Sequence, residues 1–219
     1  MKEVSYAGAS AGAIIAACMV CHVPVELIKQ RFLNAAEDAS KLSMGAFSTQ
    51  FNTDQYLRKG LEILPKNAHL TASGKLFISM TRSKDMKNVI VSQWNSREEL
   101  IQSIVCSCYI PLFSGKKLPY FRGEKYIDGG FTNNIPKPYR MTLTISPFAS
   151  TASICPKDSD KPKFVKMSCE EYELSSKNLV RFIEALIPPP VEDLEELRVS
   201  GYAHAEEFVN KIRKLKLIQ

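Results

Sequence analysis

The stretch Y-A-G-A-S-A-G, residues 6–12, decides the fold of this chain, because it joins the end of a strand to the start of a helix. Residues 4–6 suit a strand end, and residues 13–21 are rich in the alanine and isoleucine that suit a helix. Between them the G-x-S-x-G spacing holds Ser10 at a sharp turn, since the flanking glycines free the backbone to fold. The spacing predicts an exposed Ser10 hydroxyl beside the unpaired N–H groups of a helix N-terminus, with Ala11 as the first donor to a developing oxyanion.

A nucleophilic serine needs a group that accepts its proton, and the sequence offers two kinds. The histidines stand at positions 22, 69 and 204, and the order of the α/β-hydrolase triad would be met by Ser10, Asp128 and His204. His204, however, falls within a predicted amphipathic helix, and His22 stands a helix length from Ser10. The other possibility is Asp128 without a histidine. Its carboxylate stands before a glycine pair and can accept the proton directly if burial raises its pKa. A turn without chemistry is the alternative interpretation of both motifs.

Composition limits the class of protein. The 219 residues are 45% hydrophobic, enough for one sizeable core, and we expect a single domain over residues 1–219. A net charge of +6 without a dense basic stripe argues against a nucleic-acid partner. The longest apolar run, residues 11–21, is shorter than the ~20 residues that span a bilayer, and Glu3 fits a signal peptide poorly. These features favour a cytoplasmic protein.

Basic residues gather at two places, which leaves an anionic lipid surface open as a partner. They are Lys116, Lys117, Arg122 and Lys125, and then Lys211, Arg213, Lys214 and Lys216. Solvated faces are the simpler interpretation of both clusters. The basic amphipathic helix predicted at 198–217 raises the same question: it suits a lipid surface, but most such helices close a core, and we expect the core role here.

The six cysteines are expected to be reduced and mostly buried, since a domain of this size needs no disulfides. The sequence C-M-V-C-H, residues 18–22, matches the C-x-x-C-H haem-attachment pattern, but no convincing export signal accompanies it. Zinc ligation by the cysteines at 18, 21, 106 and 108 is disfavoured by the C-x-C spacing of the second pair. We therefore predict neither a metal nor an organic cofactor.

The remaining elements follow from periodicity, capping and turn signals. Helices are predicted at 25–32, 53–64, 96–108, 178–187 and 198–217, and strands at 75–81, 88–94, 118–121, 125–128 and 141–146. Residues 34–50 are expected to be loop and frayed helix, and the C-terminal part, 175–219, to be helical. Strands that alternate with helices indicate an α/β fold.

A series of motifs in this order resembles the patatin-like phospholipase family, in the branch of adiponutrin and adipose triglyceride lipase. The motifs are G-A-S-A-G (8–12), S-C-Y-I-P-L-F-S-G (107–115), Y-I-D-G-G-F-T-N-N-I-P (126–136), T-L-T-I-S-P-F (142–148), I-C-P-K-D (154–158) and N-L-V-R-F-I-E-A-L-I-P-P (178–189). The resemblance covers residues 5–209 and implies a three-layer α/β/α fold with a Ser–Asp dyad. It makes Ser10 the nucleophile and Asp128 the proton acceptor, and it assigns the motif and oxyanion positions to Gly8, Gly12, Ala11, Gly129 and Gly130.

The resemblance also implies an activity and a location. The expected reaction is hydrolysis of a lipid acyl ester, of the triacylglycerol or acylglycerol lipase or phospholipase type, through an acyl-serine intermediate. Some members of the branch are transacylases. A lipid ester is the expected substrate, no cofactor is implied, and the usual location is a lipid droplet or membrane.

One departure from the family pattern bears on activity. Family members begin with a strand, a glycine-rich turn that supplies oxyanion donors, and a helix before the serine motif, whereas Ser10 comes almost at the start of this sequence. We therefore expect an N-terminally truncated form, either an isoform or an incomplete gene model. Loss of one oxyanion donor can cost about 10²–10³ in turnover. The alternative function is a catalytically weak patatin-like protein that binds lipid or a partner.

Overall fold

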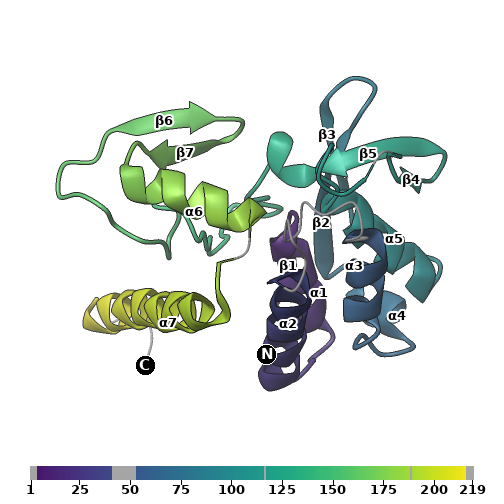
Figure 1. Ribbon diagram of the computed structural model, residues 1–219, viewed down its shortest axis with the longest axis horizontal. Helices are drawn as coiled ribbons and strands as arrows, with labels where there is room; N and C mark the ends of the chain where they lie inside the picture. Colours follow the sequence, from purple (N-terminus) through teal and green to yellow (C-terminus); the bar gives the residue numbers. More distant parts are fainter. Residues whose placement is uncertain (1–3, 41–52, 116, 188, 216–219) are drawn as a thin grey trace. The chain divides into compact units, whose positions relative to one another are not determined.

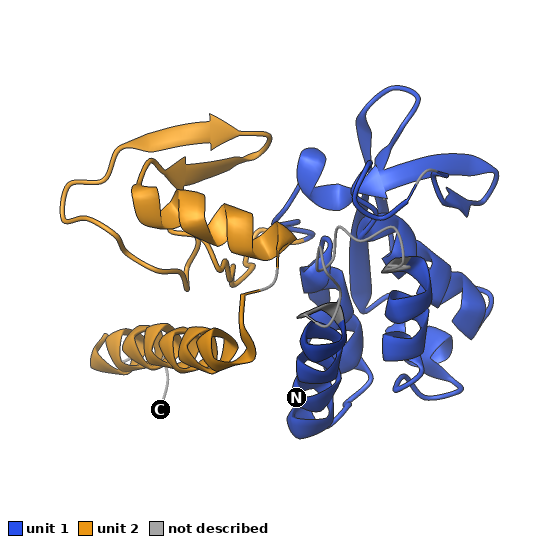
Figure 2. Cartoon of the chain, viewed as in Figure 1, with its two compact units in different colours: residues 1–138 blue, residues 139–219 orange. Residues whose placement is uncertain are grey.

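The computed structural model describes residues 4–40, 53–115, 117–187 and 189–215. Figure 2 divides the chain into two compact units, residues 1–138 and residues 139–219. Each unit has its own packed elements. The expectation of one domain over residues 1–219 stays a prediction, because this division does not establish whether the units fold together.

The first unit is built on a mixed sheet with β2 at its centre (Figure 1). β1 pairs with β2 in parallel, while β3 and β5 pair with it antiparallel, and β4 continues the sheet beyond β5. The strands are β1 (Tyr6–Gly8), β2 (Leu76–Arg82), β3 (Lys87–Val91), β4 (Tyr120–Phe121) and β5 (Glu124–Asp128).

The two faces of β2 carry different side chains, as the twofold period of a strand requires. Leu76, Ile78 and Met80 are completely buried in a hydrophobic core, whereas Ser79 and Thr81 on the other face are buried polar residues. That core is shared with the helices α1 (Ala11–Val20), α4 (Ala68–Ala72) and α5 (Arg97–Ser107), and α2 (Val25–Ser40) and α3 (Thr53–Leu61) add to it. The sheet with its flanking helices confirms the predicted α/β class.

Local signals predicted most of the first unit. The strands at 75–81 and 88–94 pair as expected, and 118–121 and 125–128 form the expected hairpin. Ser96 caps α5 through a 3.0 Å bond from the Glu99 N–H to its hydroxyl oxygen, as the capping box predicted. α2 continues to Ser40, beyond the helix expected at 25–32 and into the stretch expected to be loop and frayed helix. Residues 41–52 of that stretch lie outside the described ones. The short helix α4 was not predicted.

The second unit packs a hairpin against a helix. β6 (Phe164–Met167) pairs antiparallel with β7 (Glu170–Glu173), and the helices α6 (Ser176–Leu186) and α7 (Val191–Lys214) follow. Its core is an aromatic cluster in which the Phe148 and Phe182 rings stack with centroids 4.1 Å apart and Tyr172 meets both edge-on. A charge pair, Arg181 with the nearly buried Asp158, joins α6 to the preceding loop.

Two predictions fail in the second unit. The segment 141–146 is not a strand: it forms only an isolated bridge from Ile145 to Ile154, and its inward residues are Thr144 and Ser146 while Leu143 and Ile145 face solvent. The apolar alternation that suggested a strand therefore points outward. The helix expected at 198–217 belongs to the longer α7, and none of the described α7 residues is buried, so the expectation that it closes a core was wrong. The hairpin of β6 and β7 was not predicted.

Candidate active site

The register of β2 brings the two predicted motifs together. Ile78 pairs with Gly8 of β1 and with Val91 of β3, so β1 lies on the edge of β2 opposite β3. Met80 pairs with Asp128 of β5 and also with β3, so β5 lies on that same edge. β1 runs parallel to β2 and β5 runs antiparallel, and their carboxyl ends therefore meet head-on with only Ser79 of β2 between the paired positions. Ser10 follows one of these ends and Asp128 is the other.

The turn that carries Ser10 is tight and strained. Ser10 has a φ of 53°, in the left-handed region that residues other than glycine mostly avoid. A Cβ at Gly8 would lie 2.3 Å from the carbonyl carbon and oxygen of Gly12, so the first glycine of the motif is required by close backbone contact. A Cβ at Gly12 would meet no atom within 4 Å, so packing does not require the second. The strand, turn and helix order predicted from residues 6–12 is confirmed.

A buried hydroxyl holds this turn to the sheet. The Ser10 N–H donates to Oγ of Ser107 at 2.9 Å, and that hydroxyl donates to the Ser79 carbonyl at 2.7 Å. Ser107 is fully buried at the end of α5. Because Ser79 lies between the positions that pair with Gly8 and Asp128, Ser107 links the strained residue to the middle of the site.

Asp128 presents one carboxylate oxygen that is occupied and one that is not. The carboxylate is 5% exposed, and its Oδ1 accepts a 2.7 Å bond from the Gly130 N–H. Oδ2 is buried and makes no hydrogen bond to the described residues. Burial raises the pKa of Asp128 from 3.8 to about 6, and the nearby Ser10 side chain and the Gly130 N–H oppose the rise. A carboxylate with this pKa is largely ionised at neutral pH and is a useful base.

The glycine after Asp128 is required by close contact. A Cβ at Gly129 would lie 2.1 Å from the Ser79 carbonyl oxygen, so only glycine lets the chain leave β5 at this point. The backbone of Asp128 is fixed on two sides, since its N–H donates to the Tyr109 carbonyl at 2.8 Å and its carbonyl accepts from the Thr81 hydroxyl at 2.8 Å. The end of α5, with Ser107, and the residues after it, with Tyr109, thus support both motifs.

Two of the histidines lie at the far end of α1 from Ser10. His22 follows the last turn of that helix, and Cys21 contacts the Ala68 carbonyl, which places α4 and His69 beside the same end. Ten helical residues extend about 15 Å. His204 belongs to α7 in the second unit. Neither His22 nor His69 is therefore placed to serve as a base for Ser10.

The remaining sequence hypotheses have these outcomes. The described residues hold no group of three or more His, Cys, Asp or Glu side chains that could bind a metal ion, and all six cysteines are free thiols. Burial raises the pKa of both Cys18 and Cys21 to about 11, which makes these thiols poor ligands and nucleophiles. Within the described part of the chain, no helix is long and apolar enough to cross a membrane.

All seven predicted motif residues fall in the first unit at the junction of β1, β5 and α1. They are Gly8, Ser10, Ala11, Gly12, Asp128, Gly129 and Gly130. Sequence reasoning missed Ser79 and Ser107, which connect the two motifs. Ser107 opens the S-C-Y-I-P stretch that carried part of the family resemblance, so that stretch was the available signal, although its role depends on the tertiary register of α5 and β2.

Comparison with known proteins identifies the family. The family profile described as Patatin-like phospholipase matches residues 4–138, all within the first unit. The chain belongs to the patatin-like phospholipase family. This confirms the resemblance seen in the motifs, and with it the prediction of an enzyme family that acts on lipids.

Curated patatin-like relatives match nearly the whole chain. It is 39% identical to mouse 1-acylglycerol-3-phosphate O-acyltransferase Pnpla3, adiponutrin, over 94% of this chain and 51% of the relative. It is 36% identical to mouse omega-hydroxyceramide transacylase, over 94% of this chain and 35% of the relative. Human patatin-like phospholipase domain-containing protein 4 is 36% identical, with 96% and 85% covered. The chain thus spans about half or less of the first two of these relatives.

Proposed function

We propose that this chain is a lipid acyl-ester hydrolase, of the acylglycerol lipase or phospholipase type, that uses Ser10 as nucleophile and Asp128 as proton acceptor. The observation that carries the proposal is the meeting of β1 and β5 on one edge of β2, which sets a strained serine beside a buried carboxylate. Family membership supports the lipid substrate.

Each step of the reaction has a group in this site. The Ser10 hydroxyl gives its proton to the free oxygen of Asp128, and Oγ attacks the ester carbonyl carbon. The N–H of Ala11, at the start of α1, stabilises the oxyanion that forms. Asp128 then returns the proton to the leaving alcohol, and an acyl-serine remains. Water cleaves the acyl-serine by the same proton route and releases a fatty acid. No metal or organic cofactor enters any step.

A fluorescent phosphonate, which reacts covalently with activated serines, tests this assignment. We expect the 219-residue chain to be labelled at a rate that increases as the pH rises through about 6, because Asp128 accepts a proton only when ionised. Ser10→Ala and Asp128→Asn are expected to abolish labelling, and Ser83→Ala is the matched serine control. Labelling that survives in Ser10→Ala contradicts the proposal. A folded chain that is never labelled favours instead a weakly active patatin-like protein that binds lipid or a partner.

Acyl transfer is a second candidate, favoured by the names of two relatives, an acyltransferase and a transacylase. In that reaction the acyl-serine is cleaved by an alcohol rather than by water, and the same two residues suffice. The test supplies a radiolabelled acylglycerol with and without 1-acylglycerol-3-phosphate. Label in free fatty acid alone supports hydrolysis, and label in a diacylated phosphate supports transfer.

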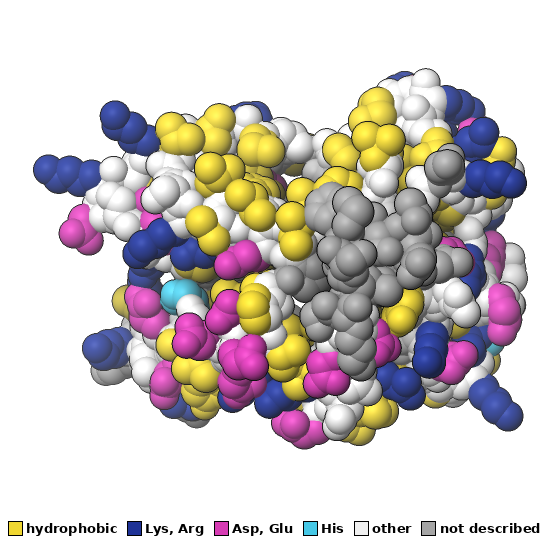
Figure 3. All heavy atoms as spheres, viewed as in Figure 1, with side chains coloured by type: hydrophobic (Ala, Val, Ile, Leu, Met, Phe, Trp, Pro, Cys, Tyr) yellow, Lys and Arg dark blue, Asp and Glu magenta, His cyan; other side chains and the backbone are white. Residues whose placement is uncertain are grey.

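We also propose that the reaction takes place at the surface of a lipid droplet or membrane. Hydrophobic side chains gather over α6 and the adjoining hairpin in Figure 3, and Leu179, Val180 and Ile183 of α6 are half or more exposed. α7 ends in a basic turn that complements anionic lipid. Sedimentation with liposomes, compared with a Val180→Glu, Ile183→Glu double variant, tests this part of the proposal, and equal sedimentation of the two chains contradicts it.

A further inference from the structure

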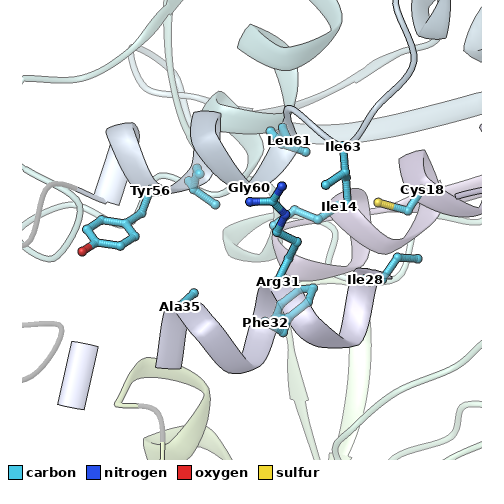
Figure 4. A pocket seen from close by; sticks show the side chains of 11 residues that line it. Ile14, Cys18, Ile28, Arg31, Phe32, Ala35, Tyr56, Gly60, Leu61 and Ile63 are labelled. Carbon is cyan, nitrogen blue, oxygen red and sulfur yellow. The ribbon is translucent and has the colours of Figure 1, made fainter. Parts of the chain in front are cut away.

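A cavity of about 160 Å³ opens between α1, α2 and α3 in the first unit (Figure 4). Its walls are almost wholly apolar, with Ile14, Phe32 and Leu57 contributed by the three helices in turn. Neither Ser10 nor Asp128 lines it. Apolar walls of this kind select hydrocarbon, because water in such a space lacks hydrogen-bond partners.

Arg31 is the only charged residue among the described ones that line the cavity. Figure 4 shows its side chain extending from α2 toward Gly60 of α3. The Arg31 side chain makes no ion pair and no hydrogen bond to the described residues. A guanidinium beside apolar walls binds a planar carboxylate well, since its parallel N–H groups match the two oxygens.

Gly60 also lines the cavity, and its lack of a side chain bears on the size of the space. It lies within α3, where glycine is destabilising relative to alanine. A Cβ built at Gly60 meets no atom within 4 Å, so helix packing does not demand glycine here. Because Gly60 lines the cavity, the missing side chain has one evident effect, which is to keep the space open.

We propose that this cavity binds a fatty acid, with its carboxylate on Arg31 and the adjoining carbons against the apolar walls. An engineered cavity of about 150 Å³ holds benzene, six carbon atoms, so a space of this size takes about six to eight carbons of a chain. Longer chains leave through the open mouth. The site uses neither residue of the proposed catalysis, and it takes the class of product that such catalysis would release.

Calorimetric titration of the Ser10→Ala chain with butanoate, hexanoate, octanoate and decanoate tests the proposal. We expect affinity to increase about fourfold for each methylene up to octanoate and to level off at decanoate. Octan-1-ol has the same hydrocarbon without the charge, and we expect it to bind about threefold to fivefold more weakly than octanoate. Because Ser10 is absent, the outcome does not depend on whether the chain is a hydrolase.

Two pairs of variants assign the binding to this cavity. Arg31→Met is expected to reduce octanoate affinity to that of octan-1-ol, whereas Arg213→Met, on α7, leaves it unchanged. Gly60→Leu is expected to abolish binding, whereas Gly201→Leu, at another helical glycine with open space, has no effect. If Gly60→Leu does not fold, as judged by circular dichroism, Gly60→Ala serves with an expected severalfold loss. No saturable binding, or equal affinity in Arg31→Met, overturns the proposal.

Discussion

Asp128→Asn is expected to stabilise the folded chain at neutral pH while it removes the proposed base. Burial raises the pKa of Asp128 from 3.8 to about 6, so the folded chain holds this proton more tightly than the unfolded chain does. The resulting contribution to stability is fully present below pH 3.8 and is lost as the pH rises through about 6. At about 1.4 kcal/mol per pKa unit, the loss amounts to about 3 kcal/mol.

Asparagine is the right replacement because it has nearly the shape of aspartate and does not titrate. Its side-chain oxygen can still accept the hydrogen bond from the Gly130 N–H. Its NH₂ group takes the place of Oδ2, the buried oxygen that has no partner among the described residues. Any constant difference between the two side chains is the same at every pH. Only the pH-dependent part of the stability difference therefore reports on Asp128.

Urea unfolding at several pH values between 4 and 8 measures this difference. Trp94, the single tryptophan, is 5% exposed in the first unit, so its fluorescence follows the unit that holds the site. The free energy of unfolding of Asp128→Asn relative to the native chain should rise by about 2.4 kcal/mol from pH 4 to pH 8, because the rest of the effect lies below pH 4. A difference that stays constant across this range would refute the reasoning, because Asp128 would then titrate at its ordinary pKa.

Three further variants test the geometry of the turn. Gly8→Ala is expected to disrupt the fold and abolish phosphonate labelling, because its Cβ would lie 2.3 Å from the backbone of Gly12. Gly12→Ala places a Cβ that meets no atom within 4 Å on a residue of α1, so this variant should unfold at the same temperature as the native chain or slightly above it. Ser10→Gly should be about 1 kcal/mol more stable to urea than Ser10→Ala, because only glycine adopts a φ of 53° without strain. Ser107→Ala leaves the Ser10 N–H and the Ser79 carbonyl without their shared partner, and a loss of about 2 kcal/mol with slower labelling is expected. Unchanged unfolding and labelling in Ser107→Ala would show that the turn does not need this link.

The parts of the fold that were predicted correctly depend on local chemistry. The cap of α5 needs only Ser96 and the backbone three residues on, and the hairpin of β4 and β5 needs only its turn. The strand predicted at 141–146 was wrong because alternation of apolar and polar residues does not show which set faces the core. Here Thr144 and Ser146 face inward and form hydrogen bonds with a neighbouring loop. The hairpin of β6 and β7 was missed because its strands are mostly exposed or charged and carry no clear apolar face.

The candidate site divides in the same way. Ser10 and Asp128 could be predicted as candidate site residues from their motifs, because the neighbouring glycines indicate where the backbone makes a tight turn. The link through Ser107 could not, since it exists only when the end of α5 packs beside the middle of β2. Nor could the cavity beside Arg31, because three helices form its walls and their packing is set by the core they share.

The local costs at Ser10 and Asp128 support the proposed dyad over a turn without chemistry. A structural turn at Ser10 would be relieved by glycine, yet a serine keeps the strained φ of 53°. A structural Asp128 would be better replaced by asparagine, yet a carboxylate stays buried with one oxygen bonded to Gly130 and the other without a partner among the described residues. These two local costs meet at one edge of β2. The proposed chemistry, which needs a hydroxyl beside a base, accounts for both.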